Sequence, residues 1–266
     1  MYEIFVNNKS EDVIIAVPAL GERKEMFKPL ADKMESYMWL VFDLPGSNKE
    51  ESNDYSISTF CNYIEKIIKI NNVEKAHFIG SSLGAWIIQA FANKYPEYVK
   101  SLVLLDGGHY FLGDRGDKFE EVELLSSVED FEEIRVAIQE LTFSMPNLES
   151  ESYQYFEQYF LDNYIKQGDF YTHHYNNVAY NHLSREISFV DFCLKETSIP
   201  IHLLIAEASA DDFSIQKSDL FKKKYINSRV SKIKNGQHYL SLTNTREVSD
   251  VLNAYYKKIK NFTPEL

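Results

Sequence analysis

The chain has 266 residues, of which 44% are hydrophobic and 26% charged, and its formal charge is −12 from 28 basic and 40 acidic residues. This length suits one α/β domain with a core large enough to need no disulfides. A surface this acidic repels nucleic-acid phosphates and acidic lipid headgroups, so we expect neither partner.

Short apolar runs alternate with helical patterns along much of the chain. Runs that are apolar on both faces, separated by helices, predict a mostly parallel sheet flanked by helices on both sides. The predicted strands are 13–17, 39–42, 76–79, 102–105 and 201–205, with a last candidate at 229–234.

A helical stripe is clearest in residues 56–71, where Ile57, Phe60, Ile64, Ile67 and Ile68 share one face. Ser56 or Ser58 can cap its start, because a serine oxygen accepts a hydrogen bond from the first free N–H groups of a helix. Residues 246–260 predict a final helix.

Residues 110–195 interrupt this alternation. They contain three helical patterns, at 129–141, 152–165 and 184–194, with no buried strand between them. The block stands between two predicted sheet strands, so it would lie over the strand ends where open α/β sheets bind ligands. We therefore predict an α-helical cap at 110–195, inserted in a core formed by 1–109 and 196–266; the alternative is a separate helical domain.

A nucleophile motif follows the strand 76–79. Gly80-Ser81-Ser82-Leu83-Gly84 matches G-x-S-x-G, and the helical run 85–91 comes directly after it. In this strand–turn–helix context the central serine stands exposed at the sheet edge, at a helix N-terminus that favours negative charge. Ser81 does not fit, because residues 79 and 83 are not glycines. Ser82 is therefore the predicted nucleophile.

With these motifs the chain resembles the α/β-hydrolase superfamily over most of its length. Asp43-Leu44-Pro45-Gly46 is similar to the D-x-P-G turn of that family, although a second Gly and Ser do not follow it. The resemblance implies the α/β-hydrolase fold and a catalytic triad in the order serine, acid, histidine.

The family's catalytic histidine precedes its final helix. His238, in Asn235-Gly236-Gln237-His238-Tyr239, has this position and is the predicted base, which a serine needs in order to lose its proton. His77 and His202 lie in strands and are expected in the core, while His173, His174 and His182 belong to the cap. His109 and Tyr110, just after strand 102–105, are candidates for substrate binding.

The acid should follow strand 201–205. Where the family often has Asp, this chain has Ser209, so we choose Asp211, which begins an Asp-x-apolar pattern. Asp212 and Glu207 are alternatives. Asp106 is another, because some family members take the acid from the preceding strand end; otherwise it would be a turn carboxylate.

The oxyanion that forms in acyl transfer needs backbone donors. The N–H of Leu83, directly after the nucleophile, should supply one. The other should come from Pro18-Ala19-Leu20-Gly21, which replaces the family's His-Gly. Proline has no N–H, so Leu20 is the predicted second donor.

These residues predict a serine hydrolase that cleaves an ester-like bond of a small or medium, partly apolar molecule through an acyl-enzyme. The same triad would also serve a thioester, a lactone or a carbon–carbon bond, and a ligand-binding protein without turnover is a third hypothesis. The cap's many aromatic residues would form its own core and part of an apolar acyl site.

Other classes of site and location are not indicated. Cys61 and Cys193 have no C-x-x-C or zinc spacing, and we expect no metal and no cofactor. The first residues do not resemble a secretory signal and no apolar run approaches the roughly 18 residues that span a bilayer, so we expect a cytoplasmic protein without membrane insertion. The sequence does not predict an oligomeric state.

Overall fold

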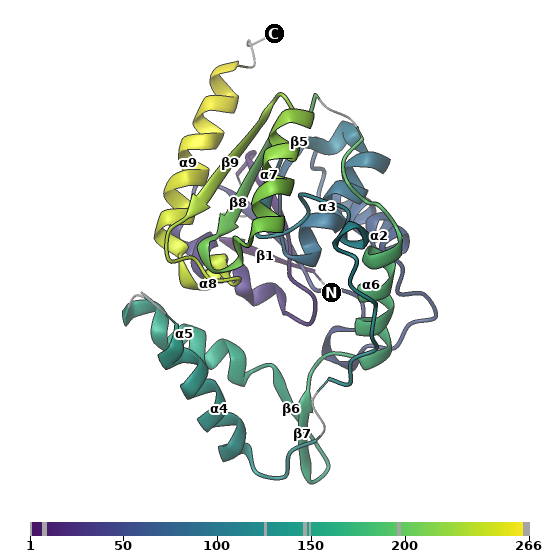
Figure 1. Ribbon diagram of the computed structural model, residues 1–266, viewed down its shortest axis with the longest axis vertical. Helices are drawn as coiled ribbons and strands as arrows, with labels where there is room; N and C mark the ends of the chain where they lie inside the picture. The colour runs from purple at the N-terminus through teal and green to yellow at the C-terminus, as the bar shows by residue number, and fades with distance from the viewer. Residues whose placement is uncertain are drawn as a thin grey trace.

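The computed structural model describes residues 2–6, 10–124, 127–145, 148, 150–195 and 198–262. A seven-stranded sheet runs through the molecule in the order β1-β3-β2-β4-β5-β8-β9 (Figure 1). Only the edge strand β1 is antiparallel to its neighbour, so the predicted mostly parallel sheet is confirmed. The strands are β1 (Tyr2–Val6), β2 (Val13–Val17), β3 (Met38–Phe42), β4 (Ala76–Ser81), β5 (Val99–Leu105), β8 (Ile201–Ala206) and β9 (Ser228–Ile233).

Helices cover both faces of this sheet, because its central strands are apolar on both sides. Every residue of β2, β3, β4 and β8 is buried. Alternate residues of β2 enter two separate cores: Ile15 and Val17 face one, Ile14 and Ala16 the other. The first core is closed by α2 (Ile57–Ile70), α3 (Leu83–Lys94) and α7 (Asp212–Lys224), and the second by α1 (Lys28–Lys33), α8 (Leu240–Thr243) and α9 (Thr245–Phe262).

Helix α2 illustrates how the local sequence selects its element. Ser56 caps the first turn by accepting a hydrogen bond from the N–H of Thr59. The predicted apolar stripe, which includes Phe60 and Ile64, is buried in the first core. Capping and amphipathic spacing therefore agree in this helix.

The segment between β5 and β8 contains an antiparallel hairpin as well as helices, so the prediction of an all-helical insertion was wrong in part. Its elements are α4 (Phe131–Ser144), α5 (Ser150–Leu161), β6 (Tyr164–Gln167), β7 (Phe170–His173) and α6 (Asn177–Phe189). The hairpin turns at Gly168, whose φ of 62° is disfavoured for other residues. Asn176 caps α6, so this helix begins earlier than the 184–194 pattern suggested.

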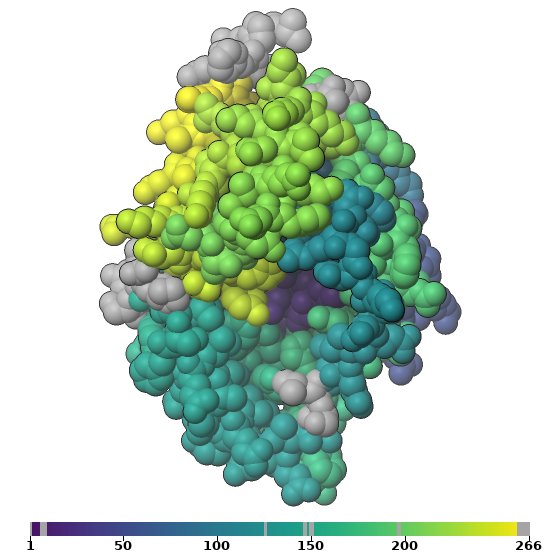
Figure 2. All heavy atoms as spheres, viewed as in Figure 1, coloured from purple at the N-terminus to yellow at the C-terminus, as the bar shows by residue number. Residues whose placement is uncertain are grey.

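We use the word cap for residues 110–195; this division stays a prediction, and the core boundary at residue 196 lies outside the described residues. The cap contacts the core on two sides. Phe156 of α5 belongs to the buried cluster of α8 and α9, whereas Leu183 of α6 belongs to that of α2 and α3. Between them the surface is hollowed, with atoms of the N-terminal part of the chain, in purple, at the floor (Figure 2). Within the described ranges, no helix is long and apolar enough to cross a membrane.

Candidate active site

Ser82 occupies a sharp turn between β4 and α3. Its φ of 48° and ψ of −116° are unusual for a residue with a side chain. The two flanking glycines permit this turn: a Cβ on Gly80 would lie 2.3 Å from the carbonyl oxygen of Gly84, and one on Gly84 would lie 2.2 Å from that of Val17. Ser82 is partly exposed while Ser81 is buried, which agrees with the choice between the two serines.

Asp106 and His238 form a direct pair. His238 Nδ1 lies 2.6 Å from Asp106 Oδ2, a distance that makes the imidazole donate its Nδ1 proton to the carboxylate. The same oxygen accepts from the hydroxyl of Ser209 at 2.6 Å, and Asp106 Oδ1 accepts from the N–H of Ala206 at 2.8 Å. The carboxylate is therefore buried and fixed by three donors, and the imidazole, 45% exposed, has its Nε2 edge left for other contacts.

The acid that we expected, Asp211, is directed elsewhere, and this prediction needs correction. Asp211 caps α7 by accepting from the N–H of Ser214, and it forms an ion pair with Arg115 at 2.7 Å. Both partners hold its pKa below the usual value. The position where the family often has Asp is filled by Ser209, whose hydroxyl instead supports Asp106. The alternative at the end of β5 is thus the carboxylate that the structure places against His238.

Of the two remaining alternatives, one has other partners and the other is exposed. Glu207 pairs with Lys232 at 3.0 Å and accepts from the N–H of Asn235, which together lower its pKa. Asp212 is exposed in the first turn of α7.

Backbone contacts bring the serine turn to the Asp106 turn. The N–H of Ser82 donates to the carbonyl of Leu105 at 2.8 Å, and a Cβ on Gly107 would lie 2.6 Å from the carbonyl oxygen of Ser82. Both turns stand at the carboxyl ends of neighbouring parallel strands, β4 and β5. Since His238 reaches Asp106 from the loop after β9, three loops meet at the sheet edge where ligands bind in such folds.

The predicted oxyanion donors lie in two adjoining segments. Leu83 is the first residue of α3, and the N–H groups of a first helical turn have no partner within the helix. The loop 18–21 passes close by, because a Cβ on Gly84 would lie 2.7 Å from the carbonyl oxygen of Pro18. Among the described residues, none accepts a hydrogen bond from the N–H of Leu20. The geometry is compatible with both donors, whose role stays a prediction.

The two residues expected to bind substrate have mainly packing contacts. His109 is buried, its Nε2 lies 3.1 Å from Ser214 Oγ, and burial lowers its pKa to about 4. Tyr110 packs edge-on against Trp86 and Phe213. These contacts point toward α3 and α7, so they favour a structural role for both residues.

A buried carboxylate that the sequence did not single out stands near the same strand ends. Glu22 follows the Leu20 loop, is 8% exposed, and accepts from the hydroxyl of Tyr159 at 2.7 Å. Burial raises its pKa. Burial of a glutamate by a helix that is distant in sequence leaves no local pattern. The one feature of the sequence that could have indicated Glu22 was its position two residues after the predicted Leu20 donor.

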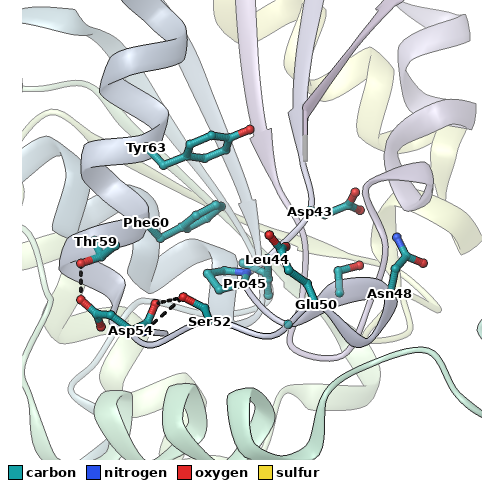
Figure 3. A pocket seen from close by; sticks show the side chains of 12 residues that line it. Asp43, Leu44, Pro45, Asn48, Glu50, Ser52, Asp54, Thr59, Phe60 and Tyr63 are labelled. Atoms are coloured by element: carbon teal, nitrogen blue, oxygen red, sulfur yellow. Dashed lines mark hydrogen bonds between the residues drawn. The ribbon is translucent and has the colours of Figure 1, made fainter.

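A separate pocket of about 610 Å³ opens between α2 and the loop after β3 (Figure 3). Phe60 and Tyr63 form its aromatic wall, and Asp43, at its far side, is paired with Lys24 at 3.0 Å. Neither Ser82 nor His238 lines it. We therefore place the candidate active site at the strand ends, where Ser82 and the pair of Asp106 and His238 lie, and not in this pocket. Over the described ranges, no group of three or more histidine, cysteine or acidic residues is arranged to hold a metal ion.

Comparison with known proteins defines the family. The family model for the alpha/beta hydrolase fold matches residues 12–257. The chain belongs to the α/β-hydrolase family. The strand-end turns at Ser82, Asp106 and His238 all fall within the part that matches this α/β-hydrolase model.

Individual relatives of this α/β-hydrolase are distant. Lipase 3 of Moraxella sp. (strain TA144) is 30% identical over 104 residues, which is 38% of this chain and 33% of the lipase. The chain thus matches about a third of the lipase's length. The thioesterase domain from the curacin biosynthetic pathway superposes with a TM-score of 0.72 at 13% identity, covering 95% of this chain and 94% of that domain. An esterase from Exiguobacterium antarcticum gives 0.70 at 13% identity, covering 96% and 94%. The two structural likenesses concern the fold.

Proposed function

We propose that this α/β-hydrolase is a serine hydrolase of carboxylic esters, which acts through an acyl-enzyme on Ser82. The observation that carries the proposal is the 2.6 Å contact between His238 Nδ1 and the buried Asp106 carboxylate. An imidazole held in this way keeps its Nε2 unprotonated and available as a base, and the carboxylate stabilises the imidazolium that forms.

In the proposed reaction, Ser82 Oγ attacks the ester carbonyl while His238 Nε2 takes the hydroxyl proton. The negative charge that develops on the carbonyl oxygen is stabilised by the N–H groups of Leu83 and Leu20. His238 then returns the proton to the departing alcohol, which leaves an ester on Ser82. A water molecule, deprotonated by the same histidine, releases the carboxylic acid and restores the serine.

The proposed acid is Asp106 in place of Asp211. Asp106 lies one strand before the position expected from sequence, and Ser209 completes its hydrogen bonding. Its three hydrogen bonds fix the carboxylate against the imidazole. This supports its proposed task, which is to hold the imidazole in one orientation and tautomer.

Two serines that adjoin in sequence provide the test. Ser82→Ala should abolish hydrolysis of p-nitrophenyl butyrate and labelling by a fluorophosphonate probe, a loss of about 10⁴-fold or more in kcat. Ser81→Ala is the matched control, because the Ser81 hydroxyl is buried without a hydrogen-bond partner among the described residues. It should keep both activities.

Labelling of the Ser82→Ala variant would overturn the nucleophile. No labelling of the folded wild-type protein would instead favour a ligand-binding role. If labelling succeeds, kcat/KM for matched oxygen esters and thioesters will show which acyl bond the site prefers.

A further inference from the structure

Glu22 is a carboxylate buried between the core and the cap. It lies in the loop after β2 and is 8% exposed. Its neighbours come from distant elements: Tyr159 belongs to α5, and Asn163 stands between α5 and β6. Because desolvation of a charged carboxylate is costly, a glutamate in such a position needs compensating partners.

The hydrogen bonds that Glu22 forms with other described residues use one of its oxygens. The N–H of Arg23 donates to the Tyr159 hydroxyl at 3.0 Å, so this hydroxyl can direct its own proton to Glu22 Oε2 at 2.7 Å. The amide of Asn163 donates to the same oxygen at a longer distance of 3.4 Å. Among the described residues, none donates to Glu22 Oε1.

No cation touches this carboxylate in the described parts of the chain. The neighbouring Arg23 guanidinium donates to Asn163 Oδ1 and to the carbonyl of Tyr159, and its nearest carboxylates are those of Glu25 and Asp162. Burial therefore dominates and raises the pKa of Glu22. A positively charged group placed against Oε1 would recover much of the lost solvation.

Glu22 follows the loop that passes the nucleophile turn, because a Cβ on Gly84 would lie 2.7 Å from the carbonyl oxygen of Pro18. After burial, its charge contributes to the raised pKa values of Tyr164, Tyr180 and Tyr239, which come from β6, α6 and the loop that carries His238. The ring of Tyr180 also lies against the loop after β2, since a Cβ on Gly21 would be 3.3 Å from it. A cation is attracted to the faces of such rings as well as to a carboxylate.

We propose that Glu22 and the nearby ring of Tyr180 form an ammonium-binding subsite, so that the enzyme prefers substrates carrying a positively charged amine. This subsite deepens the proposed function. It rests on that function in one respect, namely that the substrate binds in the hollow beside Ser82. The amine donates to Glu22 Oε1, while Tyr159 and Asn163 hold the carboxylate in place. The subsite selects the substrate and takes no part in proton transfer.

The test measures binding without turnover, using Ser82→Ala protein at pH 7.5 and ligand-observed NMR. Benzylammonium and benzyl alcohol have the same shape and differ in charge, and phenylacetate supplies the opposite charge. We expect benzylammonium to bind at least tenfold more tightly than benzyl alcohol, and phenylacetate to bind most weakly. Equal binding of benzylammonium and benzyl alcohol would overturn the subsite before any change is made to Glu22.

Two further variants locate the preference. Adding Glu22→Gln keeps the shape and an acceptor for Tyr159 but removes the charge, so the tenfold preference should disappear while the alcohol binds as before. Glu25→Gln is the matched control, because it removes the same charge from a carboxylate that pairs with Lys24 at 2.9 Å. Loss of the preference in Glu25→Gln, or its survival in Glu22→Gln, would contradict the assignment.

The two proposals fail in different ways. If the wild-type protein hydrolyses no ester but its Ser82→Ala variant still prefers benzylammonium, the proposed function is wrong and the subsite stands. If esters are hydrolysed and both neutral and charged ligands bind equally, the subsite is wrong and the nucleophile stands.

Discussion

The strand-end turns and the cap are held in place by different kinds of contact. The turns of Ser82 and Asp106 are joined through the backbone, as in the hydrogen bond from the N–H of Ser82 to the carbonyl of Leu105. The cap is held by side chains that reach core loops: Tyr159 contacts Glu22, and His174 contacts the carbonyl of Gly21. Backbone contacts tolerate many sequences, whereas side-chain contacts depend on particular residues. The turns can therefore be kept while the contacts between cap and core change.

The sharpest test of the turns compares two carboxylates. Asp106→Asn should lower kcat by about 10⁴-fold, because an amide at this position no longer selects the imidazole tautomer that acts as a base. Asp211→Asn should change kcat by less than about threefold, since Asp211 caps α7 and pairs with Arg115 on the surface. Steady-state hydrolysis of p-nitrophenyl butyrate measures both. A large loss in Asp211→Asn with an unaffected Asp106→Asn would restore the acid expected from sequence.

This comparison also shows what the sequence could predict. The six parallel strands and the Ser82 turn follow from local patterns, namely apolar runs and paired glycines, whereas His238 was chosen from the resemblance to the family. The edge strand β1 was not predicted. The contact of Asp106 with His238 could not be predicted in this way. The Ser209 hydroxyl that supports Asp106 lies at the end of the neighbouring strand, and no local pattern connects the two residues. The hairpin β6–β7 was missed because its short strands are only partly buried, so they lack the apolar runs that identified the sheet.

The next effect concerns the fit of α3 against the sheet. Gly84→Ala should destabilise the protein by about 3 kcal/mol or more, because the added Cβ would lie 2.2 Å from the Val17 carbonyl oxygen and backbone must move. Gly116→Ala, with nothing within 4 Å and a φ of 78°, should cost only about 1 to 2 kcal/mol for its conformation. Urea unfolding gives both values. Similar losses would mean that the turn absorbs the methyl group.

A smaller effect is expected where the cap contacts the loop after β2. Tyr159→Phe should cost about 1 to 3 kcal/mol, because it takes a donor from the buried Glu22 carboxylate. Tyr153→Phe, on the same helix, removes a buried hydroxyl that has no hydrogen-bond partner in the described part of the chain, so it should be nearly neutral. Thermal unfolding of the two variants compares them. Equal melting temperatures would show that the Tyr159 contact adds little to the attachment of the cap.

The last effect depends on pH and concerns His174, a buried histidine where the cap meets two core loops. Its Nε2 lies 3.0 Å from the carbonyl of Gly21, and its Nδ1 faces the N–H of Asn48 at 3.3 Å. Nδ1 must therefore accept, and Nε2 carries the proton. Burial, aided by the charge of His173, lowers the pKa of His174 to about 3. The folded protein thus favours the neutral ring.

The direction of the pH effect follows from this lowered pKa. An unfolded histidine binds a proton near its ordinary pKa of about 6.5, whereas the folded one resists it, so stability is full above that pH and is lost as pH falls toward 3. His174→Gln keeps one donor and one acceptor but cannot titrate. Between pH 6.5 and 4 its unfolding free energy should fall less steeply than that of the wild type, by up to about 1.4 kcal/mol per pH unit. Parallel curves in urea unfolding over this range would show that the imidazole is protonated without loss of the contact between cap and core.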